Sequence, residues 1–254
     1  MRITYRINEK YRYMERALLG IPPSFERLGE VLKKGRNEIR VIEVEGIPLN
    51  VKSYKRPNPL NRLVYAYLRA SKAQRSYDHA FRLAGAGIGT PEPVAYIVYR
   101  ERLGVTRSFY ISRHVAFDRE FRDLKGSRPP DMEELLKAFT RFTHDLHRHH
   151  IYFLDHSPGN TLITKKGEDY RFHLVDLNRM KFTRVSPRKG LRNFRRLNAD
   201  EEMIQVIATE YARLTNSDPG KMTRLLARWT ARHDERVRKR RARKEKTRRR
   251  QEGR

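Results

Sequence analysis

The stretch "HHIYFLDHSPGNTLI", residues 149 to 163, places one aspartate, Asp155, between a short apolar run and a Ser-Pro-Gly-Asn turn. The asparagine of that turn, Asn160, follows Asp155 by five positions. A second stretch, "FHLVDLNRM", residues 172 to 180, carries another carboxylate, Asp176, just after an apolar run. We expect these two carboxylates and one amide to converge at one edge of a helical lobe.

The second half of the chain has mostly helical patterns. Asp131 and Glu134 have the spacing of a capping box, and the apolar residues that follow predict a helix over 131–149. Residues 161–177 predict a strand hairpin that turns near Gly167. The stretches 201–215 and 220–233 have the periodicity of amphipathic helices.

The first half is typical of a sheet with one helix. Residues 25–56 predict strands, with turns at 35–37 and 45–46. In the last of these strands Lys52 lies on the face opposite the apolar residues. A helix is predicted from Asn61 to Ala84, with an apolar face that includes Phe81, and residues 94–115 predict two strands around a loop near Gly104. The pattern favours an α+β fold with a small antiparallel sheet lobe before a mostly helical lobe.

Composition limits the partners of this chain. Its 254 residues contain no cysteine, which excludes disulfides and thiolate metal sites and fits a reducing cytoplasm. No apolar run approaches eighteen residues, and the first twenty residues have no signal-peptide core, so neither a membrane span nor export is expected. The net charge of +27 calls for an anionic partner: nucleic acid, an acidic membrane, or a phosphorylated or carboxylated substrate.

Four of these residues together fit phosphoryl transfer from a magnesium nucleotide, a reaction in which positioning and charge neutralisation dominate. They are Lys52, Asp155, Asn160 and Asp176. Asp176 and Asn160 carry the hard oxygen ligands that Mg²⁺ prefers. Lys52 is suited to hold phosphates, and Asp155 to orient an acceptor hydroxyl and accept its proton.

Four stretches together resemble a known family. "LNVKSYKRP", "QRSYDHAFRLAGAGIGTPEPVAY", "DLHRHHIYFLDHSPGNTLI" and "HLVDLNRMKF" are similar, in this order, to motifs of the protein-kinase-like fold, and within it to the bacterial lipopolysaccharide core kinases (the Kdo/heptose kinase family). The resemblance covers roughly residues 25 to 200. It implies an N-lobe over 25–113 and a C-lobe over 114–230, flanked by an N-terminal extension, 1–24, and a basic tail, 231–254.

The resemblance implies a phosphotransferase with an alcohol group as acceptor. ATP would be the donor, Mg²⁺ the cofactor, and a Kdo or heptose hydroxyl of the lipid A–core saccharide the acceptor. The protein would be cytoplasmic and peripheral at the inner membrane. Further site residues implied are the backbone of His114, Val115 and Ala116 for adenine, the loop Gly35, Arg36 and Asn37 over the phosphates, and Asp78 as the acidic partner of Lys52.

Three departures from the family pattern stand out. Phe153-Leu154 replaces the usual His-Arg before the catalytic aspartate, so the loop must be anchored differently. Leu177-Asn178 replaces the Phe-Gly that usually follows the metal aspartate in the kinase fold, a replacement that is common in the lipopolysaccharide kinases but removes the hinge glycine. The helix glutamate that normally pairs with the strand lysine has no clear counterpart; Asp78 is the best acidic candidate, with Gln74 or Ser76 as alternatives in that column.

Simpler interpretations stay open at this point. Asp155 and Asn160 could cap local backbone, Asp176 could pair with Arg179, and Lys52 could be a solvated strand lysine. The five histidines between 144 and 156 could hold zinc, although their spacing favours packing, with His147 under the catalytic loop. The tail could bind anionic lipid or nucleic acid. A kinase acting on a protein or ribosome-associated partner, and a non-catalytic nucleic-acid-binding module, remain alternatives.

Overall fold

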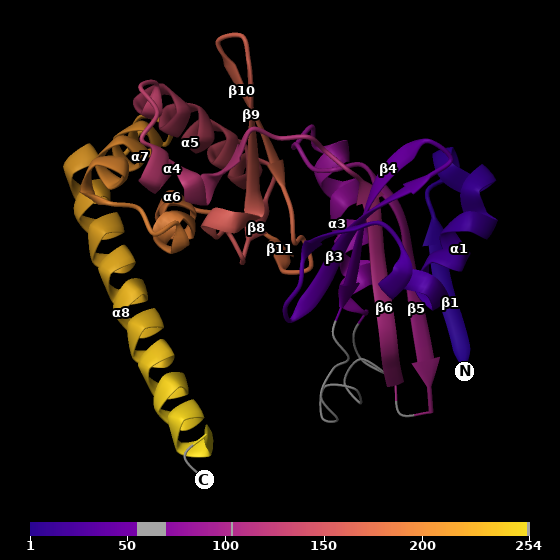
Figure 1. The fold of residues 1–254 in the computed structure, drawn as a ribbon. Helices are drawn as coiled ribbons and strands as arrows, with labels where there is room; N and C mark the ends of the chain where they lie inside the picture. Colours follow the sequence, from indigo (N-terminus) through magenta and orange to yellow (C-terminus); the bar gives the residue numbers. More distant parts are fainter. Residues whose placement is uncertain (55–69, 103, 253–254) are drawn as a thin grey trace. The chain divides into compact units, whose positions relative to one another are not determined.

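The computed structural model describes residues 1–54, 70–102 and 104–252, and the chain forms two compact units (Figure 1). The first comprises Met1–Ala116 and His173–Arg179, and the second comprises Phe117–Phe172 and Met180–Arg254. The first is built on a sheet and the second mostly on helices, so the α+β class predicted from the sequence is confirmed.

The first unit contains a six-stranded sheet in the order β1-β5-β6-β4-β3-β2, and its neighbouring strands are antiparallel. Valine and isoleucine recur along these strands, and the Leu49 and Val51 side chains on β4 are fully buried. The strands are β1 (Arg2–Ile7), β2 (Glu30–Lys33), β3 (Asn37–Val44), β4 (Ile47–Tyr54), β5 (Pro93–Glu101) and β6 (Gly104–Arg113).

The first 24 residues, predicted as a separate N-terminal extension, are built into this unit. Strand β1 pairs with β5 along its whole length. The helical segments η1 (Glu9–Met14), α1 (Glu15–Ser24) and η2 (Phe25–Arg27) follow it. Tyr11, Met14, Leu18 and Ile21 pack into the same buried cluster as the apolar residues of β4, β5 and β6. The sheet therefore depends on the N-terminal segment for one edge strand and part of its core.

Helix α3 (Lys72–Gly85) is shorter than the helix predicted from Asn61. Residues 61–69 lie outside the described residues, and the described helix begins after Ser71, whose side chain accepts a hydrogen bond from the Gln74 backbone N–H as an N-cap. The buried side of α3 includes Ser76, Tyr77 and Leu83, whereas Phe81 is 42% exposed. The prediction of Phe81 as a core residue is wrong.

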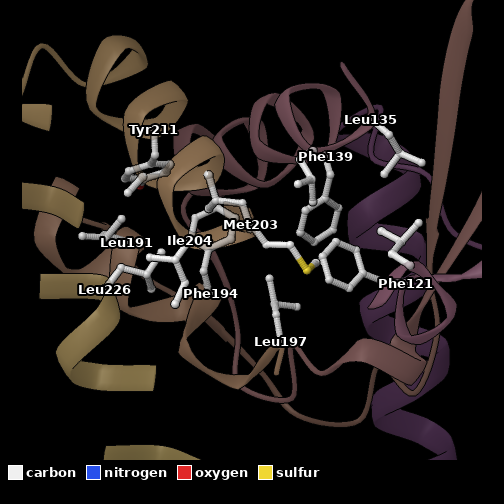
Figure 2. Packing of buried hydrophobic residues seen from close by; sticks show 14 of the residues in the cluster. Phe121, Leu135, Phe139, Leu191, Phe194, Leu197, Met203, Ile204, Tyr211 and Leu226 are labelled. Atoms are coloured by element: carbon white, nitrogen blue, oxygen red, sulfur yellow. The ribbon is translucent and has the colours of Figure 1, made fainter. Parts of the chain in front are cut away.

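In the second unit, the long helix α5 (Met132–Arg148) packs against α7 (Glu201–Leu214), and α7 packs against α8 (Pro219–Glu252). Figure 2 shows Phe139 of α5, Ile204 and Tyr211 of α7, Leu226 of α8 and Phe194 in one buried cluster. The remaining elements are β7 (Arg119–Glu120), η3 (Phe121–Asp123), α4 (Leu124–Ser127), β8 (Ile151–Phe153), η4 (Pro158–Asn160), β9 (Thr161–Lys166), β10 (Asp169–Leu174), β11 (Met180–Phe182), α6 (Pro187–Leu191) and η5 (Arg192–Arg196).

Two local predictions can be compared with these elements. The hairpin is confirmed: β9 and β10 are neighbours in one sheet, and Gly167 has the positive φ, 63°, that such a turn favours. The capping box at α5 is wrong. Asp131 stands at the N-cap position without capping the helix, because its carboxylate accepts hydrogen bonds from Lys165 and Tyr170 of the hairpin instead.

Within the described part of the chain, no helix combines the length and the apolar character needed to cross a bilayer.

Candidate active site

Lys52 of β4 forms an ion pair with Asp176, with 2.7 Å between Nζ and Oδ1. Both residues belong to the first unit. Lys52 is only 8% exposed, so its interpretation as a solvated strand lysine is wrong. Burying an ammonium group is costly unless an anion pairs with it, and Asp176 is the anion in contact with Lys52.

Asp176 lies in a chain segment held by hydrogen bonds on both sides of it. Leu174 exchanges two bonds with the chain after α3: its N–H donates to the Gly89 carbonyl, and its carbonyl accepts from the Thr90 hydroxyl, each at 2.9 Å. After the aspartate, the Leu177 carbonyl accepts from Nδ1 of His79 on α3 at 2.7 Å. These contacts hold Asp176 at a φ of 59°, a left-handed conformation that costs energy for a residue other than glycine.

Asn178, which replaces the hinge glycine usual in the kinase fold, is buried and donates a hydrogen bond of 2.6 Å to Oδ1 of Asp176. The same carboxylate oxygen therefore receives both Lys52 and Asn178. Asn178 adds a fixed donor beside the carboxylate where a glycine would give the backbone freedom.

More positive charge gathers around this pair. The ammonium groups of Lys52 and Lys72 lie 5.3 and 5.9 Å from the ring centroid of Tyr54, whose hydroxyl shares a hydrogen bond with Ser76 of α3. Burial lowers the pKa of Lys72, and the charge of Arg36 lowers it further, with smaller effects from Arg75 and Lys52 and an opposing one from Asp176. The surroundings of Asp176 thus hold more cations than anions, as a phosphate site requires.

Asp78 is not the partner that the structure shows for Lys52. Lys52 forms its ion pair with Asp176. The residue of α3 that contacts the Tyr54 hydroxyl is Ser76. The Asp78 carboxylate contributes to raising the pKa of Tyr96, after burial, which is the larger cause. Helix α3 therefore lies against the lysine strand through a hydroxyl pair.

The other residues predicted in the first unit occupy two places. Gly35 and Arg36 lie in the turn between β2 and β3, and Asn37 begins β3. His114, Val115 and Ala116 follow β6 and end the first long segment of the unit. The His114 N–H donates to the Pro48 carbonyl at 2.9 Å, so that amide already serves the sheet.

In the second unit, Asp155 follows β8 in a loop that is tied to itself. Asn160 donates its side-chain N–H to the Asp155 carbonyl at 2.8 Å, and the Ser157 N–H donates to the same oxygen at 2.7 Å. The interpretation of Asn160 as a local cap is therefore correct for its nitrogen. Its amide oxygen is the atom with the chemistry to bind a metal.

Arg196 of η5 contacts both the side chain and the backbone of this loop. Its guanidinium forms an ion pair of 2.8 Å with Oδ1 of Asp155 and donates a hydrogen bond of 2.7 Å to the Leu154 carbonyl. Asn193 of the same segment donates to the Phe153 carbonyl at 2.7 Å. Arg196 and Asn193 therefore anchor the loop in place of the usual His-Arg pair, which is Phe153-Leu154 in this chain.

The anchor continues inward through His147 of α5. Its Nδ1 accepts from the Tyr211 hydroxyl at 2.9 Å, and its Nε2 donates to Oδ1 of Asn193 at 3.2 Å, the tautomer that follows because Asn193 uses its N–H on Phe153. Burial lowers the pKa of His147 to about 4, so the ring is neutral near pH 7. The prediction that His147 is a hydrogen-bonding residue under the loop is confirmed.

No group of three or more histidine or acidic side chains placed to hold a metal ion occurs among the residues that the structure describes. His156 is fully buried, 5.3 Å from the ring of Phe139 and stacked on it, and burial lowers its pKa to about 3. The histidines after residue 144 thus include at least two, His147 and His156, that serve packing.

Sequence reasoning missed Asn193 and Arg196. Both lie about forty residues beyond the loop that they hold, in a segment whose sequence shows only dense positive charge. No periodicity or motif connects such residues, because the contact exists only after α5, α7 and η5 have packed.

Solved structures of other proteins resemble the fold of this chain. A solved structure described as WaaP in complex with acyl carrier protein aligns with 93% of this chain and 99% of that chain, at a TM-score of 0.62 and 21% sequence identity. The Rio2 kinase from Chaetomium thermophilum aligns with 88% of this chain and 71% of that chain, at a TM-score of 0.47 and 16% identity. A structure of WbdD with a kinase inhibitor aligns with 78% of this chain and 44% of that chain, at a TM-score of 0.46 and 13% sequence identity. No curated protein matches the sequence.

The fold is protein-kinase-like, and a match to a kinase family model makes the protein a phosphotransferase. The family model matches residues 40–217, which include Lys52, Asp155, Asn160 and Asp176. The chain belongs to the lipopolysaccharide kinase (Kdo/WaaP) family.

Proposed function

We propose that this protein transfers phosphate from ATP to a hydroxyl of Kdo or heptose in the lipopolysaccharide inner core. The observation that carries the proposal is the family match over residues 40–217. It is supported by the state of the four side chains, which are held by specific contacts: Lys52 by Asp176, and Asp155 and Asn160 by a loop anchored through Arg196.

In this mechanism Lys52 binds phosphate oxygens of the donor. Asp176 and Asn160 provide a carboxylate and an amide oxygen, a donor set that fits Mg²⁺. When bound, Mg²⁺ neutralises charge on the phosphates. Lys52 and Asn178 both contact Oδ1 of Asp176, so the orientation of this carboxylate is already fixed. Gly35, Arg36 and Asn37 cover the phosphates, and the backbone of Val115 and Ala116 contacts adenine.

Asp155 orients the acceptor hydroxyl and accepts its proton as the new P–O bond forms and the bond to ADP breaks. Arg196 keeps the Asp155 carboxylate in one rotamer through the ion pair, while its second contact fixes the backbone at Leu154. Loop and side chain thus move together.

We also propose that the protein works at the cytoplasmic face of the inner membrane, with its basic C-terminal helix against anionic lipid. Residues 231–254 carry thirteen Lys or Arg against four Asp or Glu. The similar WaaP structure is a complex with acyl carrier protein, which makes an acyl carrier protein a candidate partner for co-purification.

The test is phosphate transfer from labelled ATP to purified lipid A–core acceptor. Wild type should label the saccharide. Asp155→Asn should remove transfer and keep the rise in melting temperature that ATP and Mg²⁺ produce, whereas Asp176→Asn should lose both. The mass of the core saccharide with and without the gene checks the same activity in cells. Unlabelled saccharide together with labelled ribosomal or other protein would replace this proposal with a protein substrate.

A further inference from the structure

The segment from Arg184 to Arg196, "RVSPRKGLRNFRR", carries charge of one sign only. It has six Lys or Arg and no Asp or Glu. It forms α6 and η5, and both elements pack against α8. We refer to residues 184–196 as the basic segment.

Successive residues of the basic segment contact successive residues of the chain from Tyr152 to Asp155. The ammonium group of Lys189 lies 5.4 Å from the ring centroid of Tyr152. Asn193 then donates to the Phe153 carbonyl, and Arg196 binds the Leu154 carbonyl and the Asp155 carboxylate. The positive charges of the segment are therefore carried alongside the candidate catalytic base.

Two of these charges are held on an indole. The guanidinium carbons of Arg188 and Arg192 both lie 6.0 Å from the ring centroid of Trp229 on α8, the range of a cation–π contact. Both arginines are exposed, and within the described residues neither forms an ion pair with an acid. Trp229 thereby presents two guanidinium groups to solvent without neutralising either.

The surroundings are positive as well. Burial lowers the pKa of His233, one turn beyond Trp229 on α8, and the charge of Arg196 lowers it further. Asp234 opposes this, while Arg195 and Arg236 add smaller lowering effects. An anion that reached this surface would meet preorganised bidentate donors in a positive field.

We propose that Arg188 and Arg192, held on Trp229, form the binding site for a phosphate or carboxylate group of the acceptor saccharide. The inference rests on the proposed function and adds to it the part of the acceptor that is recognised. In a 3₁₀ segment that rises about 2 Å per residue, Arg192 lies about 8 Å from Arg196 along the axis. An anionic substituent held at Arg192 would keep its sugar within reach of the Asp155 carboxylate.

The test compares two double variants of the full-length protein that remove the same charge. Arg188→Gln/Arg192→Gln removes the proposed site, and Lys166→Gln/Arg171→Gln removes two exposed cations from the β9–β10 hairpin of the same unit. The first variant should raise the KM for lipid A–core acceptor by about tenfold, since each lost contact is a charge-assisted hydrogen bond. Its KM for ATP, its kcat at saturating acceptor and its melting temperature should match those of the control variant.

Direct binding of the purified core saccharide, before and after enzymatic removal of its phosphates, keeps the two proposals apart. If the bound group is a phosphate, dephosphorylated saccharide should bind wild type and the Arg188/Arg192 variant equally. If it is a carboxylate, dephosphorylated saccharide should still bind wild type more tightly than the variant. Equal acceptor KM values for both double variants would overturn the site and leave the kinase activity standing. Wild type that binds the saccharide through these arginines but transfers no phosphate would overturn the proposed function alone. Loss of affinity for a single-stranded RNA oligonucleotide, with saccharide binding unchanged, would also overturn the site.

Discussion

At the scale of single residues, the site depends on two carboxylates whose positions are fixed by partners far away in sequence. Asp176 is held in a left-handed conformation by the contacts of its neighbours, and its own side chain receives Lys52 and Asn178. Asp155 receives Arg196. Backbone strain at Asp176 and ion pairs at both positions are typical of residues that must be preorganised for chemistry.

Arg196→Ala should lower kcat about a hundredfold, because a small displacement of a positioned group is enough for a loss of this size. The KM for ATP and the stabilisation by ATP and Mg²⁺ should stay unchanged, and Arg196→Lys should recover part of kcat because a lysine can reach one of the two partners of Arg196. Steady-state kinetics of both variants beside Arg171→Ala, an exposed arginine on β10, would check this. A rise in the KM for ATP with kcat unchanged would contradict the positioning role.

Acid should destabilise the fold through buried histidines. The unfolded chain binds protons near pH 6.5, whereas folded His147 does so only near its pKa of about 4 and His156 near about 3. Their stabilising effect is therefore complete above pH 6.5 and is lost as the pH falls towards these folded values, by roughly 3 kcal/mol for His147. The melting temperature should fall across this window, and less steeply in His147→Gln, which keeps hydrogen-bonding groups without titrating there. Equal slopes would show that His147 is not responsible.

At the scale of elements, the Asp155 loop is held by side chains from a segment made of two short helices, α6 and η5. Helix α6 and the 3₁₀ segment η5 are five residues each, too short to be stable alone. They are kept by packing, since Leu191 and Phe194 are buried in the cluster formed by α5, α7 and α8 (Figure 2). The same packing carries Asn193 and Arg196 to the Asp155 loop.

Gly190→Ala should test this packing. A Cβ at residue 190 would lie 1.8 Å from the Tyr211 hydroxyl and 2.7 Å from Nδ1 of His147, so the buried hydrogen-bond relay must shift. We expect a loss of about 3 kcal/mol in the free energy of unfolding, together with a lower kcat. Gly126→Ala in α4, where the added Cβ meets nothing within 4 Å, should change stability by less than about 1 kcal/mol. Denaturant unfolding of both variants measures the difference; similar values would argue against a tight relay.

At the scale of the whole molecule, charge is the dominant property. The net charge is +27, and much of it lies on α8, whose buried residues Met222, Leu226 and Thr230 come before the basic run begins. Figure 1 shows α8 extending well past the part of its unit that it packs against. The helix therefore has a packed first part and an exposed, strongly basic second part.

Removing residues 238–254 should weaken binding to anionic vesicles and leave nucleotide binding intact. The segment holds eleven Lys or Arg and two Asp or Glu, and each cation near an anionic surface contributes about 1 kcal/mol. Vesicle sedimentation at low and high salt, with neutral vesicles as the control, would measure the effect. Unchanged sedimentation of the truncated protein would show that the membrane contact lies elsewhere.

Much of this architecture was accessible from the sequence alone. The α+β class, the hairpin turning at Gly167, the helix ending near His149 and the kinase family followed from periodicity, turn chemistry and motif order. These features depend on residues close together in the chain, so their physical cause lies within the stretch that is read. The role of Asp131 was predicted wrongly because tertiary partners competed with the local pattern.

The residue types, their spacing and the strongly basic balance were properties of the sequence by itself, and with them came the class of chemistry. Only the tertiary structure decided that Lys52 pairs with Asp176, that Asn193 and Arg196 hold the loop of Asp155, and that the first strand completes the sheet. Each of these contacts joins residues far apart along the chain. Their free energy appears only after the intervening chain has been ordered, and no local pattern records it.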